Sequence, residues 1–316
     1  MQTAFDFILC NWILIVILGN FLVAASNVVS KVILSGSVAK PIPPASYAFI
    51  TGVWGLAVFP FAIVINIWTG FLRFDLWEGS FGVLAGMFFV LSLWLFYSVL
   101  EKGEASRVLT VLVGAIPLFT FLLKFGVLGE RLGALQILGF GFLVVGGVLV
   151  SLKKSNDHKF TFEALFLVAL AGFGFSMGGV MTEAIFRLQG FLSGLAWVAL
   201  GYGFGALAPL ILYSARQQIF SFPQSAEQRN MLMFFLDKVL SISGALLVKF
   251  AITLQSVTLV NAFEGIKQFF VLGLAALLSF KYPQILKEEL KGAVLWEKIL
   301  AAGFVAAGIF LLVLGK

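Results

Sequence analysis

Long apolar segments separated by short polar stretches run the whole length of the chain. Each segment is about 20 residues long, which is enough for an α-helix to cross a hydrocarbon core of roughly 30 Å. The apolar residues are continuous, whereas a membrane β-barrel would alternate polar and apolar positions in pieces of about ten residues. The pattern therefore predicts an all-α membrane protein with ten transmembrane helices. The segments lie near residues 12–34, 45–68, 79–100, 106–128, 133–152, 163–186, 191–213, 231–255, 256–280 and 293–315.

A polar linker at Ser155–Lys159 divides these segments into five and five. We expect residues 1–154 to form a first five-helix repeat and residues 155–316 to form a second. An odd number of helices in each repeat would place the two repeats in opposite directions across the membrane. Inverted repeats of this kind are a common architecture of secondary transporters.

A weak internal similarity supports the division. In the fourth segment Ser106 precedes Pro117 by eleven positions, and in the ninth segment Ser256 precedes Lys267 by the same spacing. We interpret this as a trace of repetition between the halves.

Composition agrees with a membrane protein. Of the 316 residues 61% are hydrophobic and only 11% are charged, whereas a soluble domain carries about 25% charged residues. The net charge is +6, but the basic residues lie in short loops beside apolar segments, which is typical of membrane flanks and not of a nucleic-acid surface. The only cysteine is Cys10 and the only histidine is His158, so we expect no disulfide, metal site, cofactor or catalytic triad.

The distribution of Lys and Arg predicts an orientation. Lys102, Lys154 and Arg216 fall on the side of the helix layout that collects most of the basic residues, whereas Arg73 and Arg187 fall on the other side. Positively charged loops favour the cytoplasm. We therefore expect a multi-pass protein of the plasma or inner membrane with both termini facing outward.

The stretch from Glu104 to Lys154 combines a helix start of small residues, a mid-helix proline, a Gly-Glu-Arg-Leu turn and a glycine-rich second helix. The positions are Ala105, Ser106, Pro117, Gly129, Glu130, Arg131, Leu132, Gly139, Gly146 and Gly147. This pattern resembles the signature hairpin of the EamA-like family in the drug/metabolite transporter superfamily. The resemblance implies a transporter of solutes. We expect structural roles for Pro117, which would kink its helix, and for the turn residues Gly129, Glu130 and Arg131.

Ionisable side chains inside the segments are the first functional candidates, because a charge at bilayer depth is costly unless it is paired or hydrated. They are Lys31, Lys124, Glu183, Lys249, Glu264 and Lys267. Lys31 and Glu183 lie toward the ends of their segments, where reaching to the membrane surface is an equally good explanation. For Lys124, one turn from the Gly-Glu-Arg turn, reaching to the surface is the better explanation.

The ninth segment carries a polar stripe. Asn261, Glu264, Lys267 and Gln268 are separated by three, four and seven positions, which places them on one face of a helix. Such a stripe must face protein or a hydrated cavity. We expect a cavity, which Lys249 in the eighth segment could join. The alternative is a Glu–Lys pair that only satisfies itself.

The resemblance adds a second group of candidates, because in the family the helices that correspond to segments one, three, four, six, eight and nine surround a central cavity. The additional positions on these segments are Asn27, Trp94, Tyr97, Thr110, Ser176 and Thr182. Trp94 and Tyr97 could stack on a flat or cationic substrate. The alternative for this pair is an interfacial aromatic belt.

These observations predict a secondary transporter that moves a small metabolite or drug-like solute by alternating access, with export as the expected direction. The chain has no Gly-Lys-Ser/Thr phosphate loop, so ATP hydrolysis is not expected. If protons drive transport, Glu264 is the first choice of proton carrier and Glu183 the second. The alternative is an exchanger of anionic metabolites, in which Lys249 and Lys267 bind the substrate.

Two other classes of membrane protein could have the same pattern of apolar segments. A lipid flippase or a non-transporting membrane subunit is an alternative to a solute carrier. An enzyme is not expected, because the segments contain no His and their one Asp, Asp237, lies near a segment end. The expected partners are a small-molecule substrate, protons and the bilayer, without nucleic acid. One chain with both halves can form a pathway, so a monomer is sufficient, and a dimer is also compatible.

Overall fold

A computed structural model describes most of the chain. The described ranges are residues 12–34, 42–69, 75–102, 105–128, 133–151, 162–221 and 228–281, together with scattered positions between 296 and 314. All regular elements in these ranges are helices, which confirms the predicted all-α membrane class. The tenth predicted segment, 293–315, lies mostly outside the described residues.

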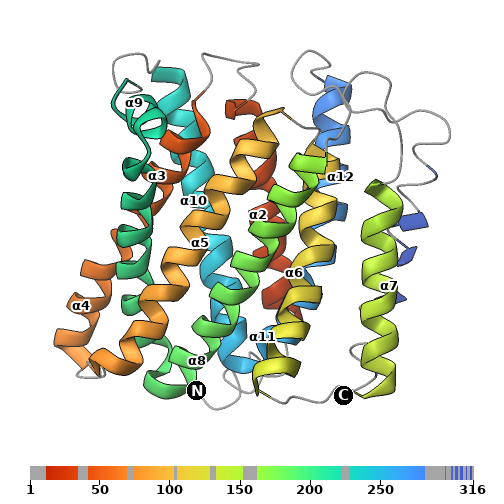
Figure 1. Ribbon diagram of the computed structural model, residues 1–316, viewed down its shortest axis with the longest axis horizontal. Helices are drawn as coiled ribbons and strands as arrows, with labels where there is room; N and C mark the ends of the chain where they lie inside the picture. The colour runs from red at the N-terminus through yellow and green to blue at the C-terminus, as the bar shows by residue number, and fades with distance from the viewer. Residues whose placement is uncertain are drawn as a thin grey trace.

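The helices stand side by side in a bundle (Figure 1). In chain order they are α2 (Trp12–Leu34), α3 (Pro44–Leu56), α4 (Val58–Thr69), α5 (Leu76–Lys102), α6 (Ala105–Leu128), α7 (Ala134–Ser151), α8 (Phe162–Leu207), η1 (Ala208–Ile211), α9 (Tyr213–Ser221), α10 (Gln228–Leu254), α11 (Val257–Ala262) and α12 (Glu264–Lys281).

Six helices in the described ranges are long and apolar enough to cross a membrane, fewer than the ten predicted. One reason is that the sixth and seventh predicted segments form one of these six, α8. The apolar parts of α6 and α7 are shorter, at Gly114–Gly126 and Ala134–Gly146.

Gly190 allows α8 to reverse direction without a loop. Its backbone has φ 79° and ψ 173°, a conformation that is essentially restricted to glycine. The first part of α8 descends in Figure 1, and the second part ascends on the left of the bundle. The chain therefore crosses the bundle twice within this element.

Two other predicted segments are each broken into two helices. The second segment breaks at Ala57, where Pro60 falls in the first turn of α4 and has no N–H to continue the hydrogen-bond ladder from α3. The ninth breaks at Phe263, between α11 and α12. Pro117, in contrast, lies within a continuous α6.

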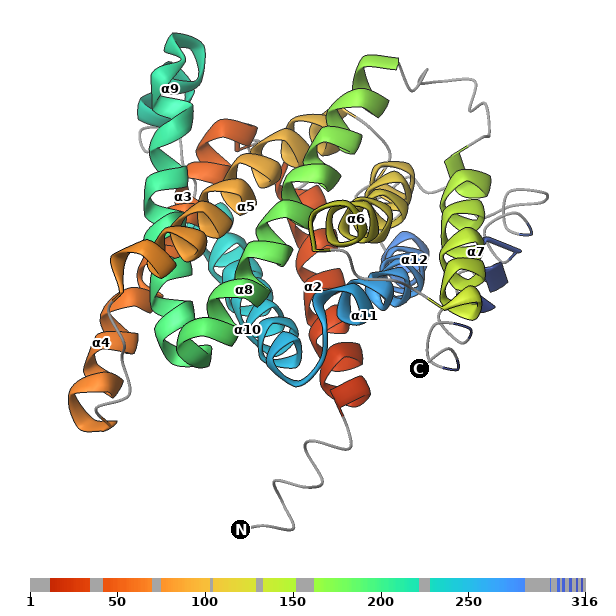
Figure 2. The ribbon, with the colours of Figure 1, turned by 60° about the horizontal axis from the view of Figure 1, so that its bottom comes forward.

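The two halves of the chain pack through one another. The third long helix of each half lies against the first helix of the other: α5 along α8, and α10 along α2 (Figure 2). Glycines permit the close approach. A Cβ atom on Gly174 would lie 2.2 Å from the hydroxyl of Ser92, and one on Gly244 would lie 2.7 Å from the carbonyl of Gly19. Small residues at such crossings are how membrane helices reach close contact.

Candidate functional site

A cavity lies between the halves, with walls from α2, α5, α6, α8, α10, α11 and α12 and about 990 Å³ of space when its opening to solvent is included. Its polar and charged lining consists of a few side chains set among aromatic and aliphatic ones. These polar positions are Asn27, Tyr97, Thr182, Ser241, Lys249, Asn261 and Lys267. Both halves contribute to this set, so neither half could form the cavity alone.

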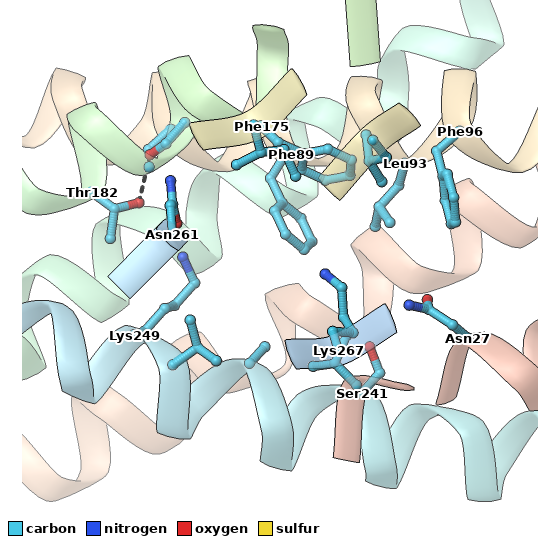
Figure 3. Close-up of a pocket in the computed structure, with 18 of the residues that line it drawn as sticks. Asn27, Phe89, Leu93, Phe96, Phe175, Thr182, Ser241, Lys249, Asn261 and Lys267 are labelled. Carbon is cyan, nitrogen blue, oxygen red and sulfur yellow. Dashed lines mark hydrogen bonds between the residues drawn. The ribbon is translucent and has the colours of Figure 1, made fainter. Parts of the chain in front are cut away.

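Two lysines approach the cavity from different helices. Figure 3 shows the ammonium groups of Lys249, on α10, and Lys267, on α12, directed into the same space near Phe89. The ammonium of Lys249 lies 5.8 Å from the ring centre of Phe89 and 5.9 Å from that of Tyr202. These ring faces stabilise the cation. Lys249 forms no ion pair with any residue that the structure describes.

Amide and hydroxyl groups complete the polar lining. Asn261 donates from Nδ2 to the hydroxyl of Thr120 at 2.9 Å, and Thr120 in turn donates to the carbonyl of Ile116 at 2.8 Å. Thr182 donates to the carbonyl of Gly178 at 2.7 Å. These bonds fix the donors and acceptors of Asn261 and Thr182 beside the cavity, where they can orient a bound solute.

Glu183 forms a buried ion pair just below the cavity wall. Its carboxylate lies 2.8 Å from the ammonium of Lys124, and Arg187 also pairs with it. The same carboxylate accepts the backbone N–H of Val257, the first residue of α11, at 3.2 Å. The prediction that Lys124 reaches to the membrane surface is therefore wrong, because the acid on α8 holds it inside the protein.

A second buried ion pair lies above the cavity, and sequence reasoning missed it. Asp237 and Lys238, on α10, are 0% and 1% exposed and 2.8 Å apart. The carboxylate of Asp237 accepts hydrogen bonds from Ser26 at 2.6 Å, Ser30 at 3.0 Å and Tyr47 at 2.6 Å.

Lys238 completes this cluster. It donates to the hydroxyl of Thr51 at 2.8 Å and lies 4.4 Å from the ring centre of Tyr47. The adjacent Asp and Lys within an apolar segment were the available signal. The apolar pattern places Asp237 near the end of a segment that begins at residue 231 and does not single out Lys238, whereas α10 begins at Gln228 and both charges are buried within the bundle.

Other predicted residues lie outside the cavity lining. Lys31 donates to the carbonyl of Leu100 at 2.7 Å, near the end of α5, where a cation is favourable. Ser176 is buried and donates to the carbonyls of Ile116 and Gly172. Trp94 packs half-buried against the apolar core.

Tyr97 does line the cavity, and its ring packs edge-on against Tyr47 with the ring centres 4.7 Å apart. It is buried within the bundle and does not lie in an interfacial belt.

Some predicted positions cannot be placed. The side chains of Glu264, Gln268 and Thr110 lie outside the described residues, and so do the turn residues Gly129, Glu130 and Arg131. The roles predicted for these residues stay predictions. Pro117 is described and is buried in α6.

Comparisons with known proteins agree with this architecture. Residues 11–152 match the EamA-like transporter family. No curated protein matches the chain. Twenty-eight solved chains match it. One of them, titled only "Crystal structure of protein", has 17% sequence identity and a TM-score of 0.61, and the match covers 92% of this chain and 96% of that one. At this identity the likeness concerns the fold alone, and it extends over both halves.

Proposed function

We propose that this chain, a member of the EamA-like transporter family of the drug/metabolite transporter superfamily by its match over residues 11–152, carries a small solute across a membrane by alternating access. The cavity between the halves carries the proposal. The lining comes from α2, α5 and α6 of the first half of the chain and from α8, α10, α11 and α12 of the second half. Movement of one half against the other would therefore change which end of the cavity is open.

We further propose that residues 1–154 and 155–316 are inverted repeats. The course of the helices supports this proposal. In Figure 1, α2 ascends and the first part of α8 descends, and likewise α5 ascends and α10 descends. The reciprocal packing of α5 on α8 and of α10 on α2 has the form that a two-fold axis in the membrane plane would produce.

The two buried ion pairs are candidates for the closures at either end of the cavity. On α8, the lining ends at Thr182 and the next residue is Glu183. On α10, the lining begins at Ser241, one turn after Asp237. Both stretches descend in Figure 1, so the two pairs bound the cavity at opposite ends. In the proposed cycle, each pair forms when its end closes and is hydrated when that end opens.

A second candidate function is exchange of anionic metabolites, and a specific observation favours it. Among the described residues that line the cavity, there are two lysines and neither Asp nor Glu. Lysines in an apolar cavity attract an anion and repel a cation. Four expectations from the sequence stay predictions. They are export as the direction of transport, proton coupling through Glu264, a location in the plasma or inner membrane with outward termini, and a monomeric state.

Transport by the purified chain in proteoliposomes tests the proposed function. We would preload the vesicles with pools of organic acids, amino acids or cationic dyes, and measure solute flux and internal pH together. Saturable flux that is lost in Lys249→Gln and retained in Lys249→Arg is the expected result. Flux of cations alone, unaffected by Lys249→Gln, would contradict a site built around the lysines.

Proton movement separates the two coupling schemes. Substrate-dependent acidification that disappears in Glu264→Gln would support the proton carrier. Anion flux that depends on an anion on the opposite side and leaves internal pH unchanged would support exchange.

A further inference from the structure

A side chamber opens beside the cavity, between α3, α4, α5, α8 and α10, with about 530 Å³ of space when its opening to solvent is included. It shares Phe89, Ser241, Ala245 and Lys249 with the cavity, so the two spaces are adjoining. Of the residues that line the chamber and not the cavity, six are aliphatic. These are Val58, Val90, Leu195, Ala199, Ile242 and Leu246.

The side chamber has few polar groups, and one of them, Thr51, is already hydrogen-bonded. The hydroxyl of Thr51 already donates to the carbonyl of Tyr47 at 2.7 Å and accepts from Lys238 at 2.8 Å. Besides Thr51, the described polar lining consists of Tyr202, Ser241 and Lys249. An apolar space of this kind favours a hydrocarbon or aryl group over water.

Lys249 lies at the junction of the two spaces. Its ammonium is near two rings, that of Phe89, which lines both spaces, and that of Tyr202, which lines only the side chamber. A cation in such surroundings is stabilised by a counter-charge, and no described residue supplies one by an ion pair. An incoming carboxylate or similar anion would supply it.

We propose that the cavity and the side chamber form one two-part site for an amphipathic organic anion. The anionic head binds to Lys249, with Lys267 on the facing wall, and the apolar tail lies in the side chamber. This deepens the proposed function and rests on it, since it names the class of solute that the same cavity takes. A purely polar anion would leave the side chamber empty, and an amphipathic cation would be repelled by Lys249.

Binding of a chain-length series tests this proposal. The full chain in lipid nanodiscs would be titrated calorimetrically with acetate, butyrate, hexanoate and octanoate, with empty nanodiscs as the control for partitioning. Affinity should rise roughly fourfold for each methylene that the side chamber buries. Hexylamine and 1-hexanol should each bind at least tenfold more weakly than hexanoate.

Two kinds of variant locate the parts of the ligand. Lys249→Gln should weaken hexanoate at least tenfold, whereas Lys249→Arg should retain most of the affinity. Ala199→Phe fills the side chamber and should remove the rise in affinity from butyrate to octanoate. Ile242→Phe does so from the facing helix if Ala199→Phe fails to fold. Leu207→Phe, on the exposed surface of α8, is the matched control and should keep the rise.

Two outcomes would overturn the proposal. One is an affinity in the parent protein that does not change with chain length, and the other is a rise that persists when the side chamber is filled. The octanoate titration would be repeated with and without anionic lipid in the nanodisc. If the site takes its anion from the bilayer, anionic lipid should compete with octanoate and weaken its binding. If the site takes its anion from water, anionic lipid should leave octanoate binding unchanged. Binding is measured without flux, so anion binding with no transport would reject the proposed function and leave this inference standing.

Discussion

At the residue scale, the charges inside the bundle divide into two kinds. Glu183 and Lys124 pair with each other, as do Asp237 and Lys238, and all four are buried. Lys249 instead faces the cavity between aromatic rings. A paired charge holds helices together, whereas a charge directed into a cavity is available to a solute.

Removing one member of the upper pair should destabilise the protein strongly. Asp237→Ala leaves the ammonium of Lys238 buried without its carboxylate, which should cost about 3–5 kcal/mol. We expect a clear fall in the temperature of unfolding of the purified protein. The double variant Asp237→Asn with Lys238→Gln removes both charges and should recover much of the loss. An unchanged unfolding temperature for Asp237→Ala would contradict a structural role for the pair.

Neutralising Glu183 should loosen the lower end of the cavity. Glu183→Gln weakens the links from α8 to Lys124 on α6 and to the first N–H of α11. In a Cys10→Ser background with Ser241→Cys as the reporter, we expect labelling by a membrane-impermeant thiol reagent to become several-fold faster from that end. Glu163→Gln, exposed at the start of the same helix, is the control and should have no effect. Equal labelling rates in both variants would remove the pair from gating.

At the element scale, hydrophobic length predicted the helical membrane class and most segment positions, but it did not predict where helices break. Residue 190 was expected to lie in a loop, and the structure shows instead an immediate reversal that only the backbone freedom of Gly190 explains. The sequence also could not predict which buried charges pair, because Glu183 and Lys124 come from different helices far apart in the sequence. The spacing of Asn261 and Lys267 did indicate a polar face, and both line the cavity.

Substituting the reversal glycine should cost stability through the backbone alone. A Cβ atom on Gly190 would meet nothing within 4 Å, but its φ of 79° is unfavourable for any other residue. Gly190→Ala should therefore lower the free energy of unfolding by about 1–3 kcal/mol. Gly126→Ala is the matched control, because Gly126 lies in helical backbone and also has open space around it. Equal unfolding temperatures for the two variants would argue against the strain.

At the scale of the whole molecule, each half supplies a helix that packs against the first helix of the other half, and the cavity lies where they meet. Short glycine contacts bring these helices close together where the two halves cross. With one buried ion pair near each end of the cavity, the bundle has the parts that two alternative closures need. The central claim is that a single site is reached from both sides of the membrane in turn.

Two-sided labelling of one cavity residue tests that claim most directly. Ser241→Cys in the Cys10→Ser background would be reconstituted in vesicles and treated with an impermeant thiol reagent from outside or from inside, with Leu207→Cys on the exposed surface of α8 as the control. We predict that Ser241→Cys is labelled from each side, and that a bound hexanoate slows labelling from both. Labelling from one side only, whatever the solute conditions, would contradict alternating access through this cavity.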